Sequence, residues 1–155
     1  MKKEPKISII TIVKDGMPFL DDALKSFDLQ SYKNKELIVV YTHSIDKTLR
    51  TLKSKKFISK IIIDNSSKNI YGSLNVGIRS AEGDIIGLLH SDDLFFNSEV
   101  LSSVAASYKN SEFEIGYGNI IISNRYDIDK PFRNWKSNHF KKESLKFGWM
   151  PPHTS

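Results

Sequence analysis

Runs of β-branched and apolar residues alternate with segments of helical leucine spacing along residues 6–123 of this 155-residue chain. The runs are apolar at successive positions, which is typical of strands buried on both faces of a parallel sheet. Helices between such strands cross over the sheet, so the pattern indicates an α/β fold with a mostly parallel central sheet and helices on both faces. Strands are expected at 6–13, 36–41, 58–64, 84–89 and 114–123, and helices at 19–29, 44–55, 70–81, 98–108 and 138–147.

Local signals refine these elements. Ser44 is a candidate cap for the helix at 44–55, and Glu82-Gly83 is expected to close the helix at 70–81. After Asn124 charged and aromatic residues mix and the alternation is lost. We therefore expect one domain at residues 1–125 and a separate region at residues 126–155.

Composition excludes several classes of protein. The chain has no cysteine, so disulfides, zinc ribbons and thiol nucleophiles are excluded. The first residues are charged and unlike a signal peptide, and no stretch approaches the roughly 20 apolar residues of a spanning helix. A cytoplasmic protein is the expectation.

The positive charge is local. Residues 130–146 carry six basic side chains against Glu143 alone, and the rest of the chain is neutral. One basic segment without a recognition helix or interleaved stacking aromatics does not indicate nucleic-acid binding. It could instead meet anionic lipid head groups, or be an ordinary solvated surface.

The sharpest chemical feature is Asp92-Asp93, directly after the strand expected at 84–89. Adjacent carboxylates repel one another unless a cation or several donors accept them. Such hard oxygen ligands suit Mg²⁺ or Mn²⁺, which usually share their coordination shell with substrate phosphates. The alternative is that Asp92 caps the following helix while Asp93 faces water.

Three further loops should lie at the same edge of the sheet, because parallel strands end there together. They are residues 14–16, 42–46 and 65–69. Asp46 either caps its own helix or faces the sugar or base of a ligand, and Asn75 inside a helix is costly unless it bonds something. No G-x-G-x-x-G, Walker A or G-x-S-x-G pattern is present, which leaves dinucleotide, P-loop and hydrolase-triad interpretations without support.

Four segments follow one another in an order that resembles the nucleotide-binding half of family 2 glycosyltransferases. They are ISIITIVKDG, FLDDALKSFDLQSYKNKELIVV, SIDKT and IYGSLNVGIRSAEGDIIGLLHSDD. The likeness spans about residues 7–117, and the tail GWMPPH is similar to bacterial members that build cell-surface polysaccharides. The resemblance implies a GT-A fold, a Rossmann-like sandwich of the nucleotide-diphospho-sugar transferase type. It assigns nucleotide-sugar binding to residues 1–125 and an incomplete acceptor side to residues 126–155.

The resemblance also implies roles for individual residues. The metal, Mn²⁺ or Mg²⁺, would be held by Asp92 and Asp93. Many relatives carry Asp where Tyr41 stands, so this ring could stack on the nucleobase, or simply finish its strand and pack on a helix. His90, Ser67 and Gly72 stand where relatives have acidic residues, which makes this site less acidic. The donor nucleotide would be contacted by Thr11, Val13, Asp15, Tyr41, Asp46, Asn75, Ser91 and Asp92.

The implied activity is metal-dependent transfer of a sugar from a nucleotide-diphosphate donor to an acceptor hydroxyl in cell-surface polysaccharide synthesis. The acceptor would be lipid-linked or a saccharide, with peripheral association at the inner face of the plasma membrane. The general base that inversion needs is unassigned. Its late candidates are Asp127, Asp129, Glu143 and His153.

Because the expected acceptor half is incomplete, we expect a truncated form of a longer enzyme that binds donor but transfers sugar poorly. Apolar residues near Phe140, Phe147, Trp149 and Met150 would then be uncovered, which favours a homodimer. The alternative is a non-catalytic nucleotide-sugar-binding module that lacks the base. A sugar-phosphate nucleotidyltransferase has less support, because its Gly-rich basic loop after the first strand is absent.

Overall fold

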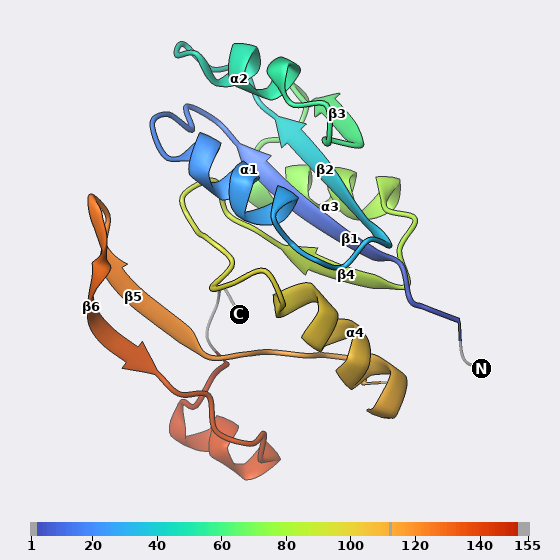
Figure 1. The fold of residues 1–155 in the computed structure, drawn as a ribbon, viewed down its shortest axis with the longest axis vertical. Coiled ribbons are helices and arrows are strands. Elements are labelled where there is room, and N and C mark those ends of the chain that lie inside the picture. The colour runs from blue at the N-terminus through green and yellow to red at the C-terminus, as the bar shows by residue number, and fades with distance from the viewer. Residues whose placement is uncertain (1–2, 112, 152–155) are drawn as a thin grey trace. The chain divides into compact units, whose positions relative to one another are not determined.

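A computed structural model describes residues 3–111 and 113–151 of the chain. These residues form two compact units that divide between residues 112 and 113 (Figure 1). The boundary expected at 125/126 falls instead inside a hairpin whose two strands, β5 (Ile120–Asn124) and β6 (Asp127–Trp135), both belong to the second unit. The functional division of the chain stays a prediction.

The first unit is built on a four-stranded sheet in the order β3-β2-β1-β4, and every pairing in it is parallel. This confirms the mostly parallel sheet. The strands are β1 (Ile7–Val13), β2 (Lys35–Tyr41), β3 (Lys60–Ile63) and β4 (Ile85–Leu88).

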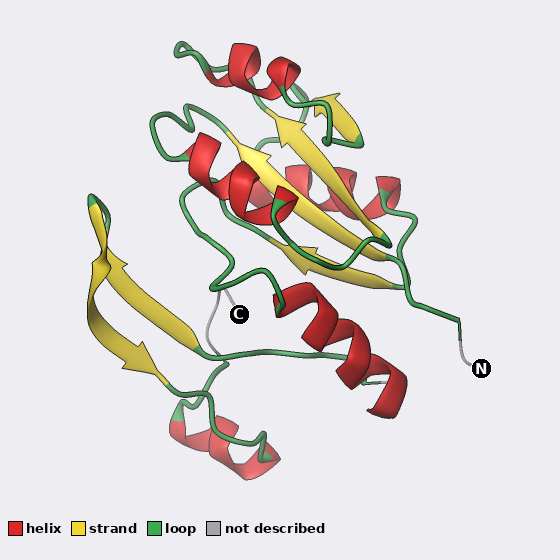
Figure 2. Cartoon of the chain, in the orientation of Figure 1, coloured by secondary structure: helices red, strands yellow, loops and turns green. Residues whose placement is uncertain are grey.

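Helices cover both faces of this sheet, as expected (Figure 2). Buried residues of α1, α2 and α4 form one core with the side chains that alternate along β1 and β2 on the same face. α3 packs on the other face, where Gly77 lies so close to β1 that an added Cβ would be 2.6 Å from Ile10 Cγ2. The helices are α1 (Leu20–Asp28), α2 (Thr48–Ser54), α3 (Ile70–Ser80) and α4 (Val100–Ser111).

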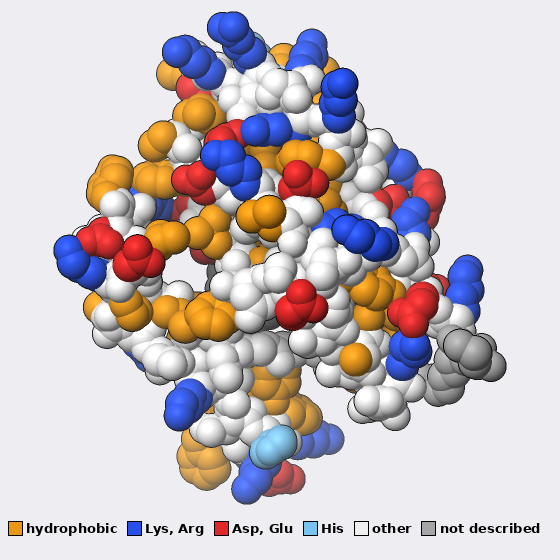
Figure 3. All heavy atoms as spheres, viewed as in Figure 1, with side chains coloured by type: hydrophobic (Ala, Val, Ile, Leu, Met, Phe, Trp, Pro, Cys, Tyr) orange, Lys and Arg blue, Asp and Glu red, His pale blue; other side chains and the backbone are white. Residues whose placement is uncertain are grey.

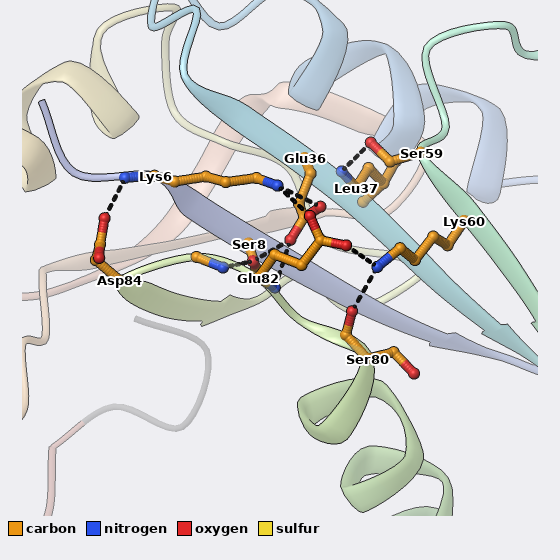
Figure 4. Close-up of polar contacts among 10 residues, drawn as sticks. Lys6, Ser8, Glu36, Leu37, Ser59, Lys60, Ser80, Glu82 and Asp84 are labelled. Carbon is orange, nitrogen blue, oxygen red and sulfur yellow. Dashed lines mark hydrogen bonds and ion pairs between the residues drawn. The ribbon is translucent and has the colours of Figure 1, made fainter.

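A buried carboxylate joins the strands at the amino edge of the sheet (Figure 4). Glu36 of β2 is 5% exposed; its carboxylate accepts hydrogen bonds from Ser8 Oγ at 2.5 Å and Glu82 N at 2.8 Å, and pairs with Lys6 Nζ at 2.9 Å. Burial alone would raise the pKa of Glu36, but these donors outweigh it and lower the pKa. Lys60 and Lys6 also lower the pKa of Glu82, to about 2. The network therefore stays ionised at neutral pH.

Gly83 lies within this network, and the expectation that Glu82-Gly83 closes α3 is wrong. α3 ends at Ser80, and the chain leaves the helix through an extended Ala81. Gly83 N donates to Ser8 Oγ at 2.8 Å. The glycine is needed for close approach to β1 and not for a left-handed cap.

The second unit consists of the antiparallel β5–β6 hairpin and a 3₁₀ helix, η1 (Lys142–Phe147). The strand expected at 114–123 begins only at Ile120, and the helix expected at 138–147 is this shorter 3₁₀ turn. β6 was not expected at all. It contains Pro131 beside a register shift, where a strand tolerates a residue without an amide hydrogen.

None of the helices in the described part of the chain has the length and apolar character needed to cross a membrane.

The close approach of Gly83 predicts a marked effect of adding one methyl group. In Gly83→Ala the new Cβ would lie 2.6 Å from Ser8 Oγ, 2.7 Å from Ser8 N and 2.8 Å from Lys6 O. Because two of these atoms belong to the backbone, we expect a loss of about 1–3 kcal/mol in unfolding free energy, measured by urea denaturation. Gly118→Ala is the matched control, since nothing lies within 4 Å of its added Cβ. Equal midpoints for both variants would contradict the prediction.

Candidate functional site

Asp92 and Asp93 follow β4 at the edge where the parallel strands end. Leu89 N still donates to Ile10 O at 3.0 Å, which keeps the chain beside β1 as it leaves the sheet. Asp93 N then donates to His90 O at 3.2 Å and closes a turn over residues 90–93. Asp92 is exposed, whereas His90, Ser91 and Asp93 are half-buried.

The segment after Asp93 is anchored to α1. Phe95 N donates to Ser26 Oγ at 3.2 Å, and the buried Gln30 donates to Asn97 O at 2.6 Å and accepts from Leu101 N at 3.1 Å. The acidic turn is thus held on both sides, by β1 before it and, after it, by Ser26 of α1 and by Gln30, which lies just past the end of α1.

The alternative in which Asp92 caps the following helix is wrong. α4 begins at Val100, and Asn97 Oδ1 accepts from Glu99 N at 2.9 Å at its start. The turn containing Asp92 ends well before that point, so its position at the strand end is not explained by helix capping.

The loops after β1 and β2 are linked by hydrogen bonds from backbone amides to side chains. Asp15 N donates to Ser44 Oγ at 2.9 Å, and Gly16 N donates to Thr48 Oγ1 at 2.8 Å. In the other direction Ile45 N donates to Asp15 Oδ1 at 2.9 Å. Asp15 has φ 50°, a left-handed conformation that Asp tolerates better than most residues. The two loops therefore form one rigid corner.

Asp46 precedes α2 and accepts a hydrogen bond from Thr48, the first residue of that helix. Its Oδ1 accepts from Thr48 N at 2.9 Å and its Oδ2 accepts from Met17 N at 3.0 Å. Hydrogen bonds from Thr48 lower the pKa of Asp46, so the carboxylate is ionised. Because Ser44 Oγ is occupied by Asp15 N and Thr42 O, the helix expected to start at Ser44 begins at Thr48. Asp46 is exposed, and contact with a ligand stays a prediction.

Asp64 also lies at this edge of the sheet, and its only sequence signal is its place at the end of the strand expected at 58–64. It follows β3 and is 4% exposed. Its carboxylate accepts from Ser66 N, Ser67 N and Ser73 Oγ, at 3.0, 3.1 and 2.9 Å. Hydrogen bonds from the Ser67 side chain and its neighbours hold the pKa of Asp64 far below its ordinary value. Asp64 thereby fixes the loop that leads into α3.

Three of the residues expected to contact the nucleotide are in the core. Thr11, Val13 and Tyr41 are 0%, 1% and 4% exposed. The Tyr41 hydroxyl accepts from Ser44 N at 3.0 Å, and the ring packs in the core as the alternative to base stacking requires. Asn75, in contrast, is exposed on α3. Their contacts with a nucleotide stay predictions.

The residues at the acidic turn fit a divalent cation of the Mg²⁺ type. Such ions are bound through one or two carboxylates together with substrate phosphates, and Asp92 and Asp93 offer two hard oxygen ligands at a strand end. Within residues 3–111 and 113–151 no group of three or more His, Cys, Asp or Glu side chains is arranged to hold a metal. A metal here would depend on a bound diphosphate for the rest of its shell.

The candidates for the general base lie in the second unit. Asp127, at the start of β6, forms an ion pair with Lys130 Nζ at 2.6 Å. Asp129 is exposed on β6 and Glu143 on η1. His153 lies outside the described residues. A hollow of about 570 Å³ in the same unit is lined by residues 117–119 and 136–139.

Comparison with known proteins gives the family. Glycosyl transferase family 2 matches residues 8–154. The chain belongs to this family. One relative, the putative glycosyltransferase EpsE of Bacillus subtilis, is 28% identical over 134 residues, 83% of this chain and 48% of EpsE. The Campylobacter jejuni GalNAc(5)-diNAcBac-PP-undecaprenol beta-1,3-glucosyltransferase is 26% identical over 83% of this chain and 42% of its own.

Solved structures agree on the fold. S. aureus TarS 1-349 in complex with UDP-GlcNAc superimposes with a TM-score of 0.63 at 22% identity, covering 76% of this chain and 34% of its own. Mannosyltransferase PcManGT of Pyrobaculum calidifontis, in complex with GDP-Man and Mn²⁺, gives a TM-score of 0.61 at 18% identity over 81% and 39%. The GT-A fold is confirmed, and the family 2 chain spans less than half the length of these relatives.

The buried Tyr41 hydroxyl predicts a stability effect. In Tyr41→Phe the Ser44 amide loses its acceptor while the ring packing is kept, so we expect a loss of about 1 kcal/mol in unfolding free energy. Tyr71→Phe removes a hydroxyl from a ring that is 72% exposed, and should change stability little. Urea denaturation of the two variants checks this. A stability loss no larger for Tyr41→Phe than for Tyr71→Phe would contradict the role given to this hydroxyl.

Proposed function

We propose that the chain is the donor-binding part of a metal-dependent glycosyltransferase that acts in bacterial cell-surface polysaccharide synthesis. The observation that carries this is the position of Asp92-Asp93, at the carboxyl end of β4 in a GT-A sheet. The donor would be a nucleotide-diphosphate sugar, because structures with the same fold are complexed with UDP-GlcNAc or GDP-Man.

Asp92 and Asp93 would hold Mn²⁺ or Mg²⁺ against the donor diphosphate. The metal supplies Lewis-acid neutralisation of the charge that the diphosphate gains as the sugar leaves. Asp92 is exposed and Asp93 is half-buried in the turn closed by His90 O. The two residues therefore present their carboxylates from a fixed backbone, which suits a site that must orient a phosphate.

The corner of the loops after β1 and β2 would receive the nucleoside. Asp15 and Asp46 are exposed there on a backbone fixed by cross-loop hydrogen bonds. Structures with the same fold contain either a UDP-sugar or a GDP-sugar, so uracil and guanine are both candidates for the nucleobase of the donor. The family resemblance places acidic residues of relatives where Ser67 and Gly72 stand here, so this wall of the site would be less acidic. The two residues are also closely packed, because an added Cβ at Gly72 would lie 2.9 Å from Ser67 Cβ.

The acceptor would bind in the second unit. Its hollow is lined by amide, hydroxyl and basic side chains, including Asn119, Lys136 and Asn138. Such groups can hydrogen-bond sugar hydroxyls and pair with phosphate. A relative named for an undecaprenol-diphosphate acceptor supports a lipid-linked acceptor, with a free saccharide as the other choice.

Metal-dependent nucleotide binding is the first test. At least one of the two nucleotides, UDP or GDP, should bind more tightly with Mn²⁺ than with EDTA in isothermal titration calorimetry. Asp93→Asn should remove most of this difference in affinity, because a neutral amide is a weaker ligand for Mn²⁺ than a carboxylate. The urea midpoint should stay unchanged. Asp28→Asn, an exposed residue at the far end of α1, should leave the difference intact. Equal affinity with Mn²⁺ and EDTA would reject the metal role.

Turnover distinguishes an enzyme from a binding module. The chain is incubated with UDP- and GDP-sugars, Mn²⁺ and undecaprenyl-diphosphate-linked or free sugar acceptors, and glycosidic product is measured. Product that is lost in Asp93→Asn supports the transferase. Metal-dependent nucleotide binding without product over all acceptors would support the non-catalytic module, which lacks the general base. If product forms, Asp127→Asn and Asp129→Asn test the candidates for that base.

A further inference from the structure

The described residues of the second unit include no buried core. All of its described residues are exposed or half-buried. Its most compact feature is an aromatic cluster in which the Trp149 ring lies 5.8 Å from Tyr117 and 5.9 Å from Phe140, between ring centroids. The Tyr117 hydroxyl donates to Asn138 O at 2.9 Å. This cluster fixes the chain on either side of η1.

The turn at the end of η1 places Trp149 differently from its neighbours Phe147 and Met150. Gly148 has φ 77°, a left-handed conformation that favours glycine, and the amides of Gly148 and Trp149 donate to Leu145 O and Ser144 O, both at 3.1 Å. This reversal turns Trp149 into the cluster. Phe147 is left 89% exposed and Met150 64% exposed.

Basic residues lie close to these apolar side chains in the sequence. Lys141, Lys142 and Lys146 are exposed on and next to η1, against Glu143 as the one acidic residue of 130–146. Figure 3 shows hydrophobic, basic and histidine side chains, with one acidic group among them, at the end of the view that carries η1. A surface of this kind can attract anions and also offer apolar groups for insertion.

We propose that residues 140–150, the basic-aromatic segment, dock on a membrane surface that contains anionic lipid. The three lysines pair with lipid head groups, and Phe147 and Met150 enter the boundary with the acyl chains. The inference rests on the proposed function in one respect: docking on the membrane would hold the active site beside a lipid-linked acceptor.

Two other occupants fit this segment less well. A second copy of the chain would bring two strongly basic segments together, and like charges repel. Single-stranded RNA would use flat rings for stacking, whereas Met150 and Leu145, which is 44% exposed, offer no ring. The mixture of aliphatic, aromatic and basic side chains favours lipid.

Vesicle co-sedimentation of the full chain, without nucleotide or metal, tests the inference. We expect binding to phosphatidylcholine vesicles containing phosphatidylglycerol and little binding to pure phosphatidylcholine. The triple variant Lys141→Gln, Lys142→Gln, Lys146→Gln should bind about a hundredfold more weakly, at about 1 kcal/mol per lysine. Phe147→Ala should weaken binding about tenfold, because a phenyl group is no longer buried in the acyl boundary.

Matched controls separate this segment from general charge and hydrophobicity. Replacing Lys47, Lys53 and Lys56 by Gln removes the same charge from exposed positions of the first unit. Phe96→Ala removes a phenyl group that is 76% exposed in the first unit. Both controls should retain vesicle binding, and circular dichroism should be unchanged in all variants.

Three results would overturn the proposal. One is equal binding to neutral and anionic vesicles, and another is an equal loss in the segment and control variants. The third is that vesicles do not bind, while the same lysines and Phe147 are required for another interaction. That interaction would be a dimer seen by light scattering or the binding of a uridine oligonucleotide. Metal-dependent UDP or GDP binding is measured on the same samples. A failure of vesicle binding with intact nucleotide binding therefore rejects the docking surface and leaves the proposed function standing.

Discussion

The carboxylate of Glu36 is the interaction on which the first unit depends. A charge that is 5% exposed is costly unless donors surround it. Here the donors come from different segments: Ser8 from β1, Glu82 N from the link between α3 and β4, and Lys6 from the chain before β1. One buried charge thereby fixes where three segments enter the sheet, and Gly83 lets them approach closely enough for these bonds to form.

Fixing the amino edge also places the candidate site at the other edge. The register of two parallel strands determines where each strand ends relative to the other. The register of β4 against β1 therefore determines the positions of Asp92 and Asp93, which follow the end of β4. At that edge other carboxylates bind backbone amides. Asp46 accepts from Thr48 N at the start of α2 and from Met17 N in the loop after β1, and Asp64 accepts from the amides of the loop into α3. The site is thus built on loops whose shape is set before any ligand binds.

The sequence predicted the first unit because strands buried on both faces leave long apolar runs, and it placed Asp92-Asp93 because they directly follow such a run. It could not predict β6, whose side chains are nearly all exposed and follow no apolar period, and which contains a proline. Contacts distant in sequence account for other errors. The sequence around Ser44 is typical of a helix cap, but its hydroxyl accepts a hydrogen bond from Asp15 N instead. The burial of Tyr41 depends on how the helices pack over β2.

The two units differ in what holds them together. The first has a continuous core and resists rearrangement, which suits a donor site that must orient a diphosphate. The second is held by a hairpin ladder and one aromatic cluster, with exposed apolar and basic side chains left over. Elements with few buried contacts open at low free energy, so such a unit can adjust to its partner. Under the proposed function, a rigid donor-binding unit joined to an adaptable second unit would let related enzymes keep their donor chemistry while their acceptors vary.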